Sequence, residues 1–203
     1  MAAPFGGLPT RWPPIGGNSE RSSKVAIILP GVAYAPNMAL LDLCRQALVS
    51  RSWTVQQVWW DAPRLEDVDE MIEWVDGQAE GAIAAEPDAD RVLLVGKSLG
   101  SLGCLAAARR GLPAIWLTPL LDQPRVVYAL RHRTAANLLV GGTADPSWTA
   151  SSVSGLGDEV LEIPDATHSL DVPGDVVASA RILVDLASAV ASFLDQLAVG
   201  SDL

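Results

Sequence analysis

The sequence predicts an α/β fold in which a mostly parallel sheet of about six strands is covered by helices on both faces. Six short apolar runs alternate with segments of helical periodicity, which is the pattern of strand–helix–strand units. Such runs suit strands that are buried on both faces of a sheet. The chain has 203 residues, of which 49% are hydrophobic and 19% charged, so one domain with a sizeable core is expected.

A tail and four elements make up the predicted N-terminal half. Residues 1–23 contain several Pro and Gly and lack the apolar core of a secretory signal. We therefore expect a flexible tail there and a single domain over 24–203. Strands and helices alternate at the start of this domain. In order, they are expected at Lys24–Pro30, Asn37–Ser50, Trp53–Trp60 and, as an amphipathic helix, along an apolar stripe from Leu65 to Ala82.

The C-terminal half continues the alternation with four more strands. Arg91–Val95 is predicted as a strand that leads into a helix from Ser98 to Arg110. A terminal helix is predicted because apolar residues recur at nearly ideal helical spacing between Val176 and Leu197. Between these elements we expect strands at Ala114–Leu117, Asn137–Gly141 and Glu159–Ile163, and helices at Leu121–Arg131 and Trp148–Ser154.

Composition narrows the partners that the protein can have. The 14 Lys and Arg against 24 Asp and Glu leave a net charge of −10 without a basic stripe, which argues against nucleic acid and anionic membranes. No uninterrupted apolar run has membrane-spanning length. Cys44 and Cys104 give no disulfide pattern, which fits the cytoplasm. Because no Cys/His cluster has metal-ligand spacing, we expect no metal and no cofactor.

The most informative motif is Gly96-Lys97-Ser98-Leu99-Gly100. It joins a predicted strand to a predicted helix, the context in which G-x-S-x-G is typical of a nucleophilic serine. The tight turn would put Ser98 in a sparsely populated backbone region, with unpaired helix N–H groups pointing at charge on a substrate. An ordinary strand–helix turn with Ser98 as N-cap is the alternative. A phosphate-binding loop is not, because Arg91 stands where its first glycine is required.

A nucleophilic serine needs a base, and a histidine base needs a carboxylate behind it. Ser98, Asp145 and His168 each follow a predicted strand. Because ligands of such sheets bind outside the carboxyl ends of the strands, these three side chains are expected at the site. His132 is flanked by arginines and is interpreted as a solvated residue.

The chain order Ser, Asp, His and the Gly96–Gly100 elbow resemble the α/β-hydrolase superfamily, above all small single-domain members related to dienelactone hydrolases and carboxylesterases. The resemblance covers Lys24 to about Leu197. It implies Ser98 as nucleophile, Asp145 as acid and His168 as base. Asp122, which follows the predicted strand Ala114–Leu117, is the alternative acid, because some relatives place the carboxylate after the corresponding strand.

The resemblance also implies an oxyanion hole made by the Leu99 N–H and an N–H from the loop after the first strand. Where the family usually has His-Gly, this chain has Pro30-Gly31-Val32. By position, Val32 is the expected donor and Ala33 the alternative.

Many relatives insert a cap between the fourth and fifth strands counted here. Residues 118–136 leave room for one helix but not for a lid domain, so we expect a cap-less protein with a shallow, open groove. Aromatic residues are expected to border it and to favour an apolar acyl group, namely Tyr34, Trp59, Trp60 and Trp148.

We therefore expect a serine hydrolase that cleaves a small-molecule carboxylic ester or thioester through an acyl-enzyme. An acyltransferase or cyclase that passes the acyl group to an alcohol or amine is one alternative. A hydrolase-like binding scaffold with an unreactive Ser98 is the other. A homodimer is left open.

Overall fold

A seven-stranded sheet organises the computed structural model, which describes residues 11–14, 23–64, 67–149 and 153–199. The strand order is β1-β3-β2-β4-β5-β6-β7, and every neighbouring pair is parallel except β1 with β3. The strands are β1 (Arg11–Trp12), β2 (Lys24–Leu29), β3 (Thr54–Gln57), β4 (Arg91–Lys97), β5 (Ala114–Leu117), β6 (Asn137–Gly142) and β7 (Glu159–Ile163).

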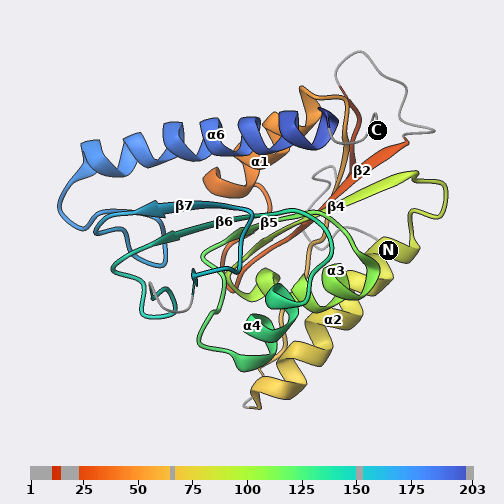
Figure 1. The fold of residues 1–203 in the computed structure, drawn as a ribbon, viewed down its shortest axis with the longest axis horizontal. Helices are drawn as coiled ribbons and strands as arrows, with labels where there is room; N and C mark the ends of the chain where they lie inside the picture. The colour runs from red at the N-terminus through yellow and green to blue at the C-terminus, as the bar shows by residue number, and fades with distance from the viewer. Residues whose placement is uncertain (1–10, 15–22, 65–66, 150–152, 200–203) are drawn as a thin grey trace.

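Helices cover both faces of the sheet, as predicted (Figure 1). One face packs against α1 (Ala39–Val49) and α6 (Val176–Val199), and the other against α2 (Val68–Ala84), α3 (Cys104–Arg110) and α4 (Pro124–Arg131). Successive residues of β2 alternate between the two cores: Ile27 belongs to the α2 side and Ile28 to the α1 side. This two-sided burial explains why the strands are continuously apolar.

Helix boundaries follow local chemistry. Asp67 caps α2 by accepting hydrogen bonds from the backbone N–H groups of Asp69 and Glu70. Gly111 ends α3 in the left-handed conformation, with φ of +62°. Of the predicted helix Trp148–Ser154, residues 150–152 lie outside the described residues, and Trp148 and Thr149 are not helical.

The seventh strand corrects the prediction of a tail over 1–23. Arg11–Trp12 pairs antiparallel with β3, so the sheet gains an edge strand. Side chains from distant segments hold it: the Trp12 indole N–H donates to Gln57 Oε1 at 3.2 Å, Arg45 lies over the Trp12 ring, and Arg11 pairs with Glu86. Two residues carry no periodicity, so this strand had no signal in the sequence. Most of 1–23 lies outside the described residues.

The terminal helix α6 is long and apolar. Its 24 residues include an 18-residue window with a mean hydropathy of 1.7, so length and composition alone would allow it to cross a membrane. Arg181, Asp185 and Asp195 interrupt the apolar sequence. Its buried residues pack in the core shared with α1, and these are Ile182, Leu186, Val190, Phe193 and Leu194.

No cap lies between β5 and β6, where the chain forms only the eight-residue helix α4. Because β2, β4, β5, β6 and β7 are parallel, the segments that follow their carboxyl ends lie on one edge of the sheet. That edge carries the candidate site.

Candidate active site

The elbow after β4 has the predicted strained geometry. Ser98 has a φ of +51°, in the left-handed region that non-glycine residues rarely occupy. A side chain on Gly96 would collide with the Gly100 carbonyl and come within 2.7 Å of the Trp116 ring. A side chain on Gly100 would collide with the Leu29 carbonyl. The two glycines are therefore required by the close backbone packing that holds Ser98 in this conformation.

The segment after the elbow is a 3₁₀ helix, η1 (Ser98–Gly103), and α3 begins only at Cys104. The predicted helix from Ser98 to Arg110 is thus two helices of different winding. Ser101 links η1 to the segment after β5, because its hydroxyl donates to the Ser98 carbonyl at 2.6 Å and accepts from the Leu120 N–H at 3.2 Å. The Leu99 N–H lies in the first turn, where helix N–H groups lack an intrahelical acceptor.

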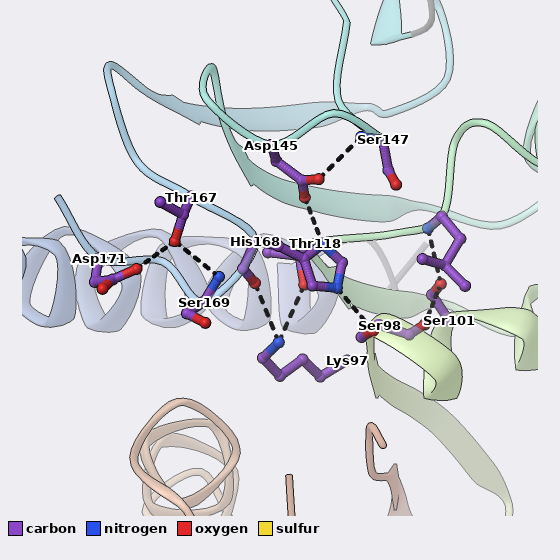
Figure 2. Close-up of polar contacts among 11 residues, drawn as sticks. Lys97, Ser98, Ser101, Thr118, Asp145, Ser147, Thr167, His168, Ser169 and Asp171 are labelled. Atoms are coloured by element: carbon purple, nitrogen blue, oxygen red, sulfur yellow. Dashed lines mark hydrogen bonds and ion pairs between the residues drawn. The ribbon is translucent and has the colours of Figure 1, made fainter. Parts of the chain in front are cut away.

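Ser98, His168 and Asp145 form one hydrogen-bonded chain (Figure 2). His168 Nε2 lies 2.8 Å from Ser98 Oγ, and His168 Nδ1 lies 2.7 Å from Asp145 Oδ2. The Asp145 side chain is 1% exposed and that of His168 is 36% exposed. The carboxylate is therefore sealed from water, while the imidazole faces the solvent edge where a substrate would enter.

Asp145 is fixed by its own loop. The Ser147 N–H donates to Asp145 Oδ1 at 2.9 Å, so the two carboxylate oxygens have different partners. Gly142, at the end of β6, leaves no space for a side chain because the Ala166 backbone packs directly on it. This close approach brings the loop after β7, with His168, onto the loop after β6.

The alternative residues lie elsewhere. Asp122 is exposed and accepts a hydrogen bond from Gln123 Nε2 at 3.2 Å, and it is not a partner of His168. His132 is exposed at the end of α4, as predicted, with Nδ1 2.8 Å from the Tyr128 carbonyl. Among the described residues, no group of three or more His, Cys, Asp or Glu side chains could hold a metal ion.

The loop after β2 turns directly over the elbow. A Cβ on Gly31 would lie 3.5 Å from the Ser98 Cβ, and the Gly31 N–H donates to the Tyr34 carbonyl at 3.2 Å. Within this turn, Ala33 has a φ of +51°. Val32, the expected oxyanion donor, therefore belongs to a short closed turn beside the nucleophile.

Three of the four predicted groove aromatics line one cavity beside this turn. Tyr34, Trp59 and Trp60 border a space of about 350 Å³ between the loop after β2 and the segment after β3. The prediction for Trp148 is wrong. Its side chain is buried against Gly141, where a Cβ would overlap the ring, and its indole N–H donates to Glu162 at 2.9 Å. Trp148 packs in the core under the site.

Lys97, the residue before the serine, is a buried charged group that the sequence analysis did not single out. Only 3% of Lys97 is exposed, and its Nζ donates to Thr118 Oγ1 and to the His168 carbonyl, each at 3.3 Å. Burial lowers the pKa of Lys97 to about 8, and the Asp145 carboxylate opposes this shift. The available signal was a lysine that directly continues an apolar strand.

The fold is that of α/β hydrolases without a cap, as predicted. Est1E from Butyrivibrio proteoclasticus matches with a TM-score of 0.69 and 16% identity over 93% of each chain. A lid-less α/β serine hydrolase from Xanthomonas campestris matches with a TM-score of 0.62 and 19% identity, over 92% of this chain and 87% of its own chain. An esterase from Pyrococcus furiosus matches with a TM-score of 0.60 and 14% identity, over 86% of this chain and 83% of its own chain. No family model and no curated protein matches the sequence.

Proposed function

We propose that the protein is a serine hydrolase that cleaves carboxylic esters or thioesters through an acyl-enzyme. The observation that carries this proposal is the chain of two short hydrogen bonds from Ser98 through His168 to the buried Asp145. A nucleophile in contact with its base, and a base oriented by a carboxylate, is the arrangement that acyl transfer requires.

Acylation follows from these contacts. Ser98 Oγ attacks the carbonyl carbon while its proton moves to His168 Nε2, 2.8 Å away. Asp145 accepts the Nδ1–H, which fixes the tautomer and stabilises the imidazolium. His168 then gives the proton to the leaving alcohol or thiol, so that the C–O or C–S bond breaks. Water, activated by His168, releases the acid and restores Ser98.

The developing oxyanion needs hydrogen-bond donors that are already in place. The Leu99 N–H is in the first turn of η1, and the Val32 N–H belongs to the turn packed against Ser98. We assign these two backbone groups to the oxyanion. Because both donors are backbone, the proline that replaces the family's usual histidine at position 30 does not remove either of them.

Because no cap covers the edge of the sheet that carries Ser98, the leaving group of a bound ester could extend into solvent. The aromatic cavity of Tyr34, Trp59 and Trp60 begins at the oxyanion turn. That cavity supports an apolar acyl or alcohol group. A structure with a similar fold is that of an esterase from Pyrococcus furiosus, which supports ester cleavage.

Labelling with a fluorophosphonate probe tests the proposal. Intact-protein mass spectrometry of the wild type should show one adduct, and Ser98→Ala should show none. Ser147→Ala is the matched control, because it removes a hydroxyl near the site but keeps the backbone N–H that bonds Asp145. No adduct on folded wild-type protein would contradict the proposal and favour a binding scaffold.

Val32→Pro tests the oxyanion assignment, because proline lacks the N–H. We expect kcat for a p-nitrophenyl ester to fall by about 10²- to 10³-fold, the loss typical of one oxyanion donor. Thermal unfolding must show that the variant remains folded. Full activity in a folded Val32→Pro would move the donor to Ala33.

A further inference from the structure

Lys97 lies at the junction of three loops that build the candidate site. Its Nζ donates to the backbone carbonyl of His168 in the loop after β7 and to Thr118 Oγ1 after β5, each at 3.3 Å (Figure 2). The same ammonium lies 4.7 Å from the centre of the Tyr34 ring, at the end of the oxyanion turn. One side chain thus contacts the segment that carries the base and the segment that carries an oxyanion donor.

A buried charge in this position is costly unless it is paired and hydrogen-bonded. The ammonium loses most of its hydration, and an uncharged residue of similar length would avoid that cost. Its partners are a carbonyl, a hydroxyl and an aromatic ring. None of these carries a full negative charge, and the Asp145 carboxylate only partly opposes the effect of burial on the Lys97 pKa, so the lost hydration is compensated only in part. Two of them, the His168 carbonyl and the Tyr34 ring, lie on segments that carry proposed catalytic groups.

We propose that the Lys97 ammonium is a positioning group, which holds the His168 loop and the Gly31–Tyr34 turn in register over Ser98. The inference rests on the proposed hydrolase function. Lys97 acts through the loops and touches no reacting atom. An ammonium has three N–H donors, and a neutral amine has fewer and lacks the positive charge. Loss of the Lys97 proton should therefore weaken both hydrogen bonds and the contact with the Tyr34 ring.

The proposal predicts a pH dependence of activity. Burial lowers the pKa of Lys97 from 10.5 to about 8, so the ammonium is lost as the pH rises through about 8. The other titratable groups that face it are Tyr34 after β2, Asp145 after β6 and His168 after β7. Of these, Tyr34 also titrates in alkali, but its pKa is raised above 10 by burial. Lys97 is thus expected to lose its proton first.

Lys97→Met is the test, with Lys24→Met as the matched control because Lys24 is the chain's other lysine and lies at the far end of β2. We expect Lys97→Met to fold, to lower kcat by about 10- to 100-fold, the cost of a small misplacement, and to change KM by less than about twofold. The wild-type rate should fall with pH around 8, and the rate of Lys97→Met should not. Lys24→Met should match the wild type in both respects.

Hydrogen exchange provides a readout that needs neither activity nor a variant. Wild-type peptides covering 30–36 and 164–172 should lose protection, after correction for intrinsic rates, as the pH rises past the pKa of Lys97. The two lysines of ¹³C-lysine-labelled protein give separate Cε signals, from which that pKa is measured directly. Peptides from α2 should show no such change.

The two proposals fail in different ways. A wild-type protein without a fluorophosphonate adduct contradicts the hydrolase function, and exchange in 30–36 and 164–172 then decides whether Lys97 anchors the loops. A wild-type protein that is labelled, with Lys97→Met retaining kcat within about twofold or with the same alkaline fall in rate, overturns the role of Lys97 alone. Unchanged loop protection across the measured pKa overturns it as well.

Discussion

The chain has two histidines, and they lie in regions that are built differently. His132 contacts its own helix: its Nδ1 lies 2.8 Å from the Tyr128 carbonyl, four residues earlier, and its ring stacks on Tyr128. His168 contacts Asp145 and Ser98, which are 23 and 70 positions away in the sequence. The comparison shows that the chemistry of a histidine here depends on distant segments meeting at the sheet edge. The contact with Tyr128 fixes the position of the His132 ring but gives it no catalytic partner.

Replacing each histidine by alanine should separate the two regions most sharply. His168→Ala removes the general base, so we expect kcat/KM for an ester to fall by about 10⁴-fold or more. His132→Ala removes an exposed ring and should change the rate by less than about twofold. Steady-state hydrolysis of a p-nitrophenyl ester measures both. Similar losses in the two variants would show that the difference in architecture has no catalytic meaning.

The two candidate acids extend the comparison. Asp145→Asn leaves a hydrogen-bonding side chain but removes the charge that holds and stabilises the imidazolium, and we expect kcat to fall by about 10⁴-fold. Asp122 lies outside the site, near the start of α4, so Asp122→Asn should be neutral. A large loss in Asp122→Asn alone would reverse the assignment of the acid.

Glycine-to-alanine changes compare the backbone packing at the Ser98 elbow with that at the end of α3, near His132. Gly96→Ala would force a side chain into the Gly100 carbonyl and the Trp116 ring, and we expect a loss of roughly 3 kcal/mol in the free energy of unfolding. Gly111, which ends α3 beside the helix of His132, has a φ of +62° but more space, so Gly111→Ala should cost about 1 kcal/mol. Urea denaturation measures both. Equal losses would mean that the elbow is no more crowded than an ordinary helix end.

Stability is also expected to depend on pH. The pKa of Lys97 is about 8 in the folded protein and near 10.5 in the unfolded chain, so the unfolded chain binds more protons between these values. The free energy of unfolding should therefore rise with pH in this window, by at most ~3 kcal/mol, relative to Lys97→Met. Denaturation of both proteins at pH 7.5 and 10 measures it. Activity is expected to fall over the same window, so charge on Lys97 would favour function and oppose stability.

The sequence was sufficient to predict features for which a local pattern also determines which distant segments meet. Six strands had continuous apolar runs, and the placement of Ser98, Asp145 and His168 after strand ends predicted their meeting, because parallel strands end at a common edge. Trp148 was assigned to the wrong side because a sequence shows an aromatic residue near a loop but not which way it turns. The adjacent Gly141–Gly142 pair was the available signal, since strand glycines leave room for a large ring.

Other features depended on contacts that no local pattern records. β1 is fixed by Trp12 and Arg11 against residues from β3, α1 and the loop after α2. The burial of Lys97 results from three loops that converge on it. For β1 the sequence neighbourhood gives no reason to expect a strand, and for Lys97 the apolar strand before it indicates burial but not the contacts that the ammonium makes.

The two residues of β1 bear on the association of the protein with other copies of itself. A strand at the border of a sheet offers unpaired N–H and C=O groups to any passing strand, a common route to aggregation. Arg11–Trp12 covers that border on β3, with Arg11 adding a charge. At the opposite border, β7 carries Glu159 and Glu162, and charge discourages pairing there too. A shortened protein that begins after residue 12 would expose β3, and its first symptom would be self-association rather than loss of the site.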